Sequence, residues 1–530
     1  MNLYYIIHIV SYLLMVGWLY FHFRFFRHGF WLNLLLLAVM AVFIYGFIPE
    51  KVTGFLLYWG LPLQGINTVF FALLDTSKKH SNISKKYTLK LQVKNGSLRL
   101  ENIRRGVSII GSAGSGKTES VVYNFLRHFR GYQFCGVIHD YKHFEITEMA
   151  YPLFNSAKLP FYIISFDTIY HRVNPIAPKY MVDEESVNEV SRVLLENLLE
   201  QRENTPTGST KFFNDAVEGL LGGLIWKLKT SHPKYCTLPH LIATFLYLDA
   251  DNLVRFISSD YTSKSMANAF ISGKDSERQT AAVLSTLANA LKKISTQRIF
   301  MALSADEVPL DINHPNNPAV VSIVNNPKFE AAYSPVIATI LHTITKQMSV
   351  RGQRHSFLMM EEAPTIRLFN MHRIPATLRS YDIATVYVLQ DKIQNDLLYG
   401  EKASRAILSN LSYQFFGKAN DPDTATYYER FFEIVKKPTT SVNKSHTLNF
   451  DTRITTGERE VAKIRANVFF RLQQGEFIAF ADGKERKIQF KPPSIVRQLP
   501  APKKVYSKAE IQANFERIHL EVRRLFQPKL

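Results

Sequence analysis

The sequence predicts an α/β fold: a mostly parallel sheet that is interrupted by an all-helical domain and preceded by transmembrane helices. Three observations predict it. An apolar strand at 107–110 runs into a glycine-rich loop, short apolar segments recur before and after a long helical region, and the N-terminus is largely uncharged. Helical spacing of apolar residues marks one group of segments, and short apolar runs mark the other. The helices are expected at 119–129, 184–203, 210–229, 238–248 and 277–299, and the strands at 107–110, 136–138, 161–166, 319–324, 357–360, 384–389 and 477–481.

The N-terminus contains three uncharged stretches, at 1–23, 28–49 and 52–74. Each is as long as the roughly 20 residues that a helix needs to cross a bilayer. Three spans would place Arg24, Arg27 and a later run of lysines on the cytoplasmic side, as the positive-inside rule requires. Polar residues and a proline interrupt the third stretch, so a re-entrant or interfacial segment remains the alternative to a third span.

The bulk composition narrows the classes of partner and site. The chain has 64 Lys and Arg against 45 Asp and Glu, a net charge of +19, which favours nucleic acid or an anionic membrane surface as partner. A generically basic protein is the alternative. Cys135 and Cys236 are the two cysteines of the sequence, so neither a disulfide framework nor a cysteine metal cluster is implied.

A complete phosphate-binding motif follows the strand at 107–110. The pattern G-x-x-x-x-G-K-[ST] lets backbone amides surround a β-phosphate at the start of a helix. Lys117 is expected to reach the β- and γ-phosphates, and the Thr118 hydroxyl to bind Mg²⁺, which predicts an ATP site. The motif comprises Gly111, Ser112, Ala113, Gly114, Ser115, Gly116, Lys117 and Thr118.

A nucleotide-hydrolysing site of this kind also needs an acidic strand. The apolar run 357–360 ends in Glu361 and Glu362, which are expected to hold Mg²⁺ and to act as general base, respectively. This pair lies far from Lys117 in the sequence. The helical segments between them therefore predict an inserted domain.

With these motifs the sequence resembles the type IV secretion coupling proteins, membrane-bound ATPases that deliver DNA to conjugation machines. The resemblance covers most of the chain and implies a RecA-like nucleotide domain with an inserted all-α domain. Besides the phosphate loop, it rests on 137–142 with its Asp-x-Lys ending, 172–176, 361–365, 378–390, 407–410 and 475–479.

The resemblance implies two further catalytic residues. Gln390 would sense the γ-phosphate at the end of a core strand, and Arg379 would act as an arginine finger on the ATP of a neighbouring subunit. A surface glutamine and a solvated helix arginine are the alternative interpretations. Glu361 occupies a position where the family more often has Asp. Which of Glu361 and Glu362 holds Mg²⁺ and which acts as general base is therefore left open.

The resemblance also implies the biological setting. The predicted function is an ATP-driven DNA translocase, multi-pass in the bacterial inner membrane, with a cytoplasmic motor and the arrangement of a homo-hexamer. It would couple a relaxosome, relaxase with single-stranded DNA, to a type IV secretion channel. Alternatives are a receptor for protein effectors and a double-stranded DNA translocase of the chromosome-partitioning kind. The expected domains are an anchor at 1–75, a nucleotide domain at 76–181 and 306–500, an all-helical insert at 182–305 and a basic tail at 501–530.

Two further regions carry expectations. Arg278, Lys292, Lys293 and Arg298 are candidates for DNA contacts in a central pore, and the polar segment 436–460 is expected to be a mobile loop. In the tail, Ser507 and Glu510 have capping-box spacing ahead of an apolar stripe. That pattern predicts a terminal helix packed on the body, or a docking helix that brings Arg523, Arg524 and Lys529 near DNA.

Overall fold

The computed structural model describes residues 85–155, 159–199, 209–444 and 452–527, together with Tyr58, Pro62 and Gly65. The chain divides into two units, Met1–Ser84 and Lys85–Leu530, and the second unit carries the fold described below. The three predicted membrane segments lie outside the described residues, apart from those three positions. Within the described part of the chain, no helix combines the length and apolarity that crossing a bilayer requires.

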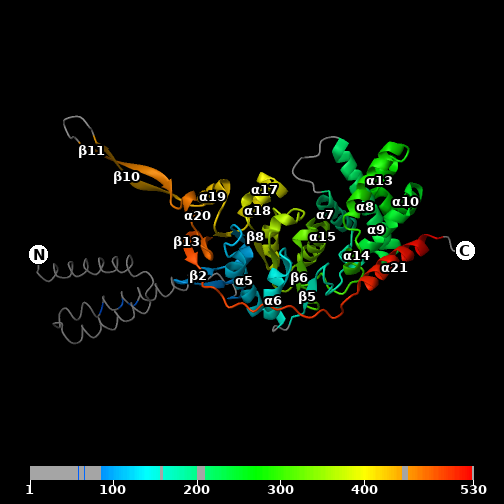
Figure 1. Cartoon of the computed structure of the whole chain (residues 1–530), viewed down its shortest axis with the longest axis horizontal. Helices are drawn as coiled ribbons and strands as arrows, with labels where there is room; N and C mark the ends of the chain where they lie inside the picture. Colours follow the sequence, from blue (N-terminus) through cyan, green and yellow to red (C-terminus); the bar gives the residue numbers. More distant parts are fainter. Residues whose placement is uncertain are drawn as a thin grey trace, which may run out of the picture. The chain divides into compact units, whose positions relative to one another are not determined.

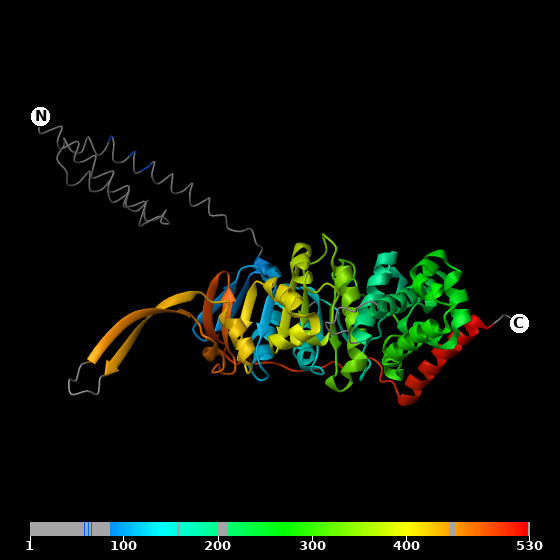
Figure 2. The ribbon, with the colours of Figure 1, turned by 90° about the horizontal axis from the view of Figure 1, so that it is seen from above.

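A nine-stranded sheet forms the centre of the second unit, in the order β13-β12-β9-β3-β8-β7-β4-β6-β5 (Figures 1 and 2). From β9 to β5 every neighbouring pair is parallel, whereas β12 runs antiparallel to both β9 and β13. The predicted mixed α/β fold with a mostly parallel sheet is therefore confirmed. The strands of this sheet are β3 (Val107–Ile110), β4 (Cys135–Asp140), β5 (Phe161–Ile164), β6 (Val320–Val324), β7 (Ser356–Met360), β8 (Ile383–Leu389), β9 (Tyr413–Phe416), β12 (Glu476–Ala481) and β13 (Lys484–Gln489).

The central strands are buried along their whole length. Every residue of β3, β4, β7 and β8 is buried, so both faces of the sheet are covered. This explains why these strands read as continuous apolar runs in the sequence. The flanking helices and turns of the nucleotide part are η4 (Lys117–Val122), α5 (Tyr123–Gly131), α6 (Glu145–Asn155), η7 (Pro327–Phe329), α15 (Glu330–Met348), η8 (Ala363–Thr365), α16 (Ile374–Leu378), η9 (Arg379–Tyr381), α17 (Lys392–Tyr399), α18 (Glu401–Ser409), α19 (Pro422–Glu429) and α20 (Ala466–Phe469).

Helices predominate among the described residues between β5 and β6, as the sequence predicts. The expected single helix at 277–299 is wrong in one respect, because it ends at Lys292 and a new helix begins at Gln297. The Thr296 side chain accepts a hydrogen bond from the Ile299 amide and so caps the second helix. The helices of this region are α7 (Glu184–Leu198), α8 (Ser209–Ser231), α9 (Leu238–Tyr247), α10 (Ala250–Ser258), α11 (Tyr261–Met266), α12 (Asn268–Ser272), α13 (Glu277–Lys292) and α14 (Gln297–Ala302), with short turns η5 (Pro178–Tyr180) and η6 (Pro233–Tyr235).

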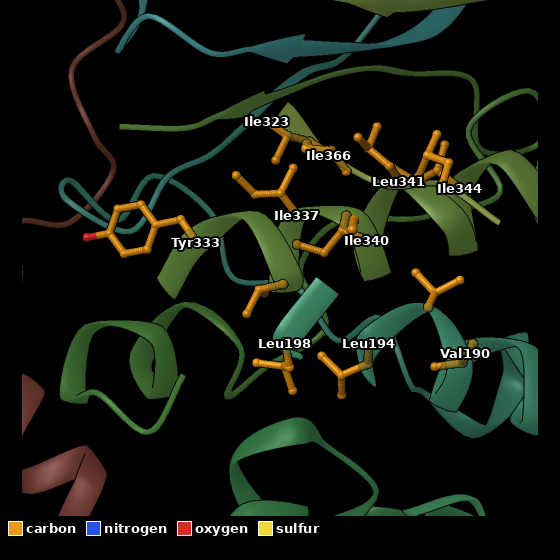
Figure 3. Close-up of a cluster of buried hydrophobic side chains, with 14 of the residues drawn as sticks. Val190, Leu194, Leu198, Ile323, Tyr333, Ile337, Ile340, Leu341, Ile344 and Ile366 are labelled. Atoms are coloured by element: carbon orange, nitrogen blue, oxygen red, sulfur yellow. The ribbon is translucent and has the colours of Figure 1, made fainter. Parts of the chain in front are cut away.

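The contact of α7 with α15 joins this helical region to the sheet. Figure 3 shows Val190, Leu194 and Leu198 of α7 facing the isoleucines of α15, with Ile323 of β6 beyond them. All of these side chains are buried in one continuous core. The helical region therefore shares the core of the sheet. Burial of an apolar side chain of this size contributes about 1.5–3 kcal/mol to the stability of the fold.

The prediction of a mobile loop at 436–460 is wrong for the residues of this segment that the structure describes, because they form two long paired strands. β10 (Ile434–Lys444) pairs antiparallel with β11 (Thr452–Ala462), and Figure 2 shows the pair extending away from the main sheet. The many Thr, Val and Ile residues in both strands favour extended backbone although the segment is polar overall. A second small hairpin, β1 (Leu89–Val93) with β2 (Gly96–Leu100), follows η2 (Lys85–Tyr87) and precedes η3 (Ile103–Arg105).

The tail forms the predicted terminal helix, α21 (Lys508–Phe526), with the capping box of Ser507 and Glu510 in place. It packs on α9 and α14 of the helical region (Figure 1). Ile518 and Val522 are buried there, and His240 of α9 lies 2.9 Å from the Glu521 carboxylate. The predicted packing of the tail on the body is confirmed.

Replacing Ile518 tests this docking. Ile518 is fully buried, so Ile518→Ala should lower the free energy of unfolding by about 2–4 kcal/mol through lost burial and a residual cavity. Leu520, two positions along, is 47% exposed, and Leu520→Ala should change it by less than about 0.5 kcal/mol. Denaturant unfolding of both variants measures the difference, and equal values would contradict the docking of α21.

Candidate nucleotide site

The phosphate loop joins β3 to η4 at the carboxyl edge of the sheet. Gly116 adopts a left-handed conformation, φ 84°, immediately before η4, a short π-helix that continues into α5. The Lys117 ammonium folds back on the loop, where it donates to the carbonyl oxygens of Gly111 and Ser112. Burial lowers the pKa of Lys117, whereas attraction from Glu362 opposes this shift. The loop therefore presents the turn, cation and helix start that its sequence predicts.

Two other segments hold the loop in place. The Ser112 amide donates to the Lys418 carbonyl after β9 at 2.7 Å, and the Gly475 amide before β12 donates to the Ser115 carbonyl at 3.0 Å. A Cβ on Gly116 would lie 2.9 Å from the Gly475 nitrogen. The loop thus fits against a backbone that has no room for a larger residue.

The donors of this loop suit a phosphate group. The hydroxyls of Ser112 and Ser115 are buried and have no hydrogen-bond partner among the described residues. Buried hydroxyls without partners are rare in proteins, and phosphate oxygens would satisfy them. The residues present therefore fit the predicted triphosphate.

The acidic pair lies at the end of β7, which is separated from β3 by β8 alone. Glu361 and Glu362 are 1% and 2% exposed. The Glu361 amide donates to the His139 carbonyl of β4 at 3.1 Å, and Glu362 adopts a left-handed backbone, φ 43°. A left-handed conformation is uncommon for glutamate and is a form of strain that concentrates at functional sites.

Gln390 lies next to the acidic pair, a contact that was not predicted from the sequence. It follows the carboxyl end of β8, and its side-chain amide donates to Glu362 Oε1 at 3.1 Å. Parallel pairing thus places the phosphate loop, the acidic pair and Gln390 at the ends of three adjacent strands.

Lys142 lies next to Glu361 and Glu362, although no role was predicted for it from the sequence. Its ammonium lies 3.4 Å from Glu361 Oε1 and 3.2 Å from Glu362 Oε1. Burial alone would lower the pKa of Lys142, but the charges of Glu361 and Glu362 outweigh it and raise the pKa. The sequence offers the Asp140-Tyr141-Lys142 segment as a signal, but no spacing rule connects it to the distant glutamates.

Burial shapes the charge of the acids. It raises the pKa of Glu361, and the charge of Asp140 adds to this effect while Lys142 opposes it. Burial also raises the pKa of Asp140, whose Oδ2 accepts hydrogen bonds from the amide and hydroxyl of Thr147. Burial thus disfavours the charged form of both acids.

Few protein ligands for a metal ion are gathered at this site. No three His, Cys, Asp or Glu side chains of the described residues form a metal-binding group. Mg²⁺ typically takes one or two protein ligands and completes its octahedron with phosphate and water. The Thr118 hydroxyl and the Glu361 carboxylate are ligands of the kind that suits this mode.

A family comparison decides the identity. Residues 184–463, more than half of the chain, match the model of the type IV secretion-system coupling protein DNA-binding domain. The chain belongs to the type IV secretion-system coupling proteins. No curated protein matches its sequence.

Solved structures share the fold of this coupling protein. The unbound bacterial conjugative coupling protein TrwBdeltaN70 is 12% identical with a TM-score of 0.61, over 79% of this chain and 93% of that chain. Plasmid coupling protein TrwB in complex with ADP and Mg²⁺ has the same identity and TM-score, over 79% and 94%. VirB4 of Thermoanaerobacter pseudethanolicus is 11% identical with a TM-score of 0.48, over 76% and 95%. At these identities the first two likenesses show a common fold.

In this coupling protein Arg379 lies away from its own phosphate loop. It stands in η9 before β8, whereas Gln390 follows the other end of that strand. Seven extended residues span about 23 Å. Arg379 is exposed and makes no side-chain hydrogen bond or ion pair within the described residues.

The four basic pore candidates divide into two groups. Arg278 and Lys292 are exposed on α13. Lys293 instead donates to the Leu198 carbonyl at 2.7 Å, and Arg298 pairs with Asp167 at 3.2 Å. The structure thus engages the second pair in contacts with the protein body.

Two glycines of the phosphate loop test its close fit. Gly116 and Gly114 both have positive φ, 84° and 75°, so alanine at either position should incur about 1–2 kcal/mol of backbone strain. Nothing lies within 4 Å of a Cβ on Gly114, whereas one on Gly116 meets the Gly475 backbone. Gly116→Ala should therefore lower the free energy of unfolding by about 1–3 kcal/mol more than Gly114→Ala does. Unfolding without nucleotide measures this, and equal losses would refute the close contact.

Proposed function

We propose that this coupling protein is a membrane-anchored, ATP-driven DNA translocase that couples a relaxosome to a type IV secretion channel. The observation that carries the proposal is the convergence of the phosphate loop, Glu361-Glu362 and Gln390 at one sheet edge, in a chain of this family. The net charge of +19 supports a polyanionic substrate. The proposed ATP and Mg²⁺ agree with the nucleotide complexes solved for TrwB.

Each residue of the site has its own role in the proposed hydrolysis of ATP. Lys117 and the loop amides hold the β- and γ-phosphates, and Thr118 and Glu361 hold the cation. Bound Mg²⁺ supplies neutralisation of the charge that develops on the phosphate oxygens. Glu362 accepts a proton from the attacking water, which Gln390 orients. The water oxygen bonds to the γ-phosphorus as the bond to the bridging oxygen breaks, releasing ADP and phosphate.

Arg379 completes the reaction on a neighbouring subunit. Its exposure and its distance from the ATP site of its own chain support a role in trans. A guanidinium supplied across a subunit contact stabilises charge in the transition state. This role requires a ring in which successive subunits bring one edge to the next, and we propose a homo-hexamer.

The domain organisation follows from the same proposal. Residues 1–75 anchor the protein in the bacterial inner membrane through two or three helices. Residues 76–181 and 306–500 form the cytoplasmic motor around the all-helical domain 182–305, and 501–530 form the basic tail. Single-stranded DNA with its relaxase is the proposed cargo, and exposed Arg278 and Lys292 are the remaining candidates for pore contacts.

Loss of Lys117 tests the motor. Lys117→Ala removes the cation that holds the phosphates, so ATP hydrolysis by the full chain should fall about 100-fold or more. Conjugative transfer should fail while relaxase nicking continues. Lys90→Ala, which removes an exposed lysine from β1, should leave both unchanged. Hydrolysis is measured with single-stranded, double-stranded and no DNA, and normal transfer by Lys117→Ala would refute the proposal.

Subunit mixing tests the role of Arg379. Arg379→Ala should lower hydrolysis by about 10³-fold, whereas Arg373→Ala, an exposed arginine nearby, should have little effect. Rings mixed from equal amounts of Arg379→Ala and Lys117→Ala subunits should regain about one quarter of the activity of the unaltered protein. A complete site forms where an Arg379→Ala subunit supplies Lys117 and its neighbour, a Lys117→Ala subunit, supplies Arg379. Absence of any recovery in mixed rings would contradict catalysis in trans.

A further inference from the structure

Lys142 lies between two buried carboxylates and solvent. Its ammonium is 3.4 Å from Glu361 and 3.2 Å from Glu362, and it is 3.8 Å from Glu145 at the start of α6. The lysine side chain is 36% exposed, whereas the two glutamates are almost fully buried. A single ammonium thus bridges the pair from the side that water can reach.

The other described contacts of the pair are neutral donors. The Tyr141 amide lies 3.3 Å from Glu361 Oε2, and the Gln390 amide bonds to Glu362. The Lys117 ammonium is engaged with its own loop carbonyls. Because buried carboxylates are stable only when they are paired or coordinated, Lys142 supplies the direct positive contact that the pair needs.

The backbone around Lys142 is built to hold it there. His143 and Phe144 follow it with φ of 47° and 75°, two consecutive non-glycine residues in the left-handed region. Such a turn is strained and persists only where its surroundings fix it. Phe144 is buried against Ile163 and Val324, which anchors the turn to β5 and β6. Packing of Phe144 therefore holds the backbone from which the Lys142 side chain reaches the two glutamates.

We propose that Lys142 is a positioning residue that occupies the place of a cation between Glu361 and Glu362, and so keeps divalent ions out until they arrive with a nucleotide. This inference rests on the proposed function, in which Glu361 binds Mg²⁺. A free divalent ion would have to displace the ammonium from both buried glutamates and leave it with partly exposed Glu145, at 3.8 Å, as its remaining partner. An ion carried by a triphosphate brings negative oxygens with which the displaced ammonium pairs. A divalent ion alone is thereby excluded from the two glutamates, whereas an ion bound to a nucleotide can reach them.

Binding of Mn²⁺ to the full chain without nucleotide tests this directly. Electron paramagnetic resonance should find weak binding to the unaltered protein, and at least tenfold tighter binding to Lys142→Met, which keeps the length of the side chain and removes its charge. Lys142→Arg should restore the exclusion. Glu361→Gln in the Lys142→Met background should abolish the new site, which distinguishes it from binding elsewhere.

Two results would overturn the proposal. One is a folded Lys142→Met protein that binds Mn²⁺ no more tightly than the unaltered chain. The other requires no variant: the unaltered chain binding Mn²⁺ equally well with and without an ATP analogue. Neither measurement depends on hydrolysis or transfer, so a motor that fails the Lys117→Ala test leaves this test readable. Thermal unfolding of each variant confirms that it is folded.

Discussion

The site depends on the order of three parallel strands, β3, β8 and β7. Glu361 is remote from Lys117 in the sequence, and only the placement of β8 between their strands brings both to one edge with Gln390. Parallel pairing aligns the carboxyl ends of all three strands. A shift in the register of one strand would move its terminal residue away from the others. The chemistry is thus a consequence of sheet order.

Motifs that act through local backbone were predictable from the sequence. The phosphate loop, the apolar strands before each site residue and the capping box of α21 all depend on neighbours within a few residues. β9 and the hairpin of β10 and β11 were not foreseen, because short or polar strands carry little apolar periodicity. The end of α13 was missed for a related reason. The helical spacing of apolar residues continues past Lys292, so the Thr296 cap that begins the next helix is not evident from that spacing.

Contacts between distant segments were beyond prediction from the sequence. Nothing in the sequence near Lys142 indicates that it meets two glutamates of another strand. The position of Arg379 shows the same limit. The family resemblance implied an arginine finger, but the separation of Arg379 from the phosphate loop of its own chain becomes clear only when the direction of β8 is known.

The extended segment between β13 and α21 connects the site to the helical region. The Tyr123 hydroxyl of α5 lies 3.5 Å from the Ser494 carbonyl, and the Gln498 amide donates to the Glu148 carbonyl of α6 at 2.9 Å. Leu499 packs on the cluster of Phe144 that anchors the turn of Lys142.

This segment is held chiefly by backbone bonding and apolar packing. The ion pair of Arg497 with Glu119 is exposed, and pairs of that kind contribute about 0–1 kcal/mol. Beyond Leu499 the chain enters α21, which is buried against α9 and α14. One segment therefore contacts the helix that follows the phosphate loop, the turn of Lys142 and the helical region in succession, and it ties these three parts together through backbone hydrogen bonds and apolar packing.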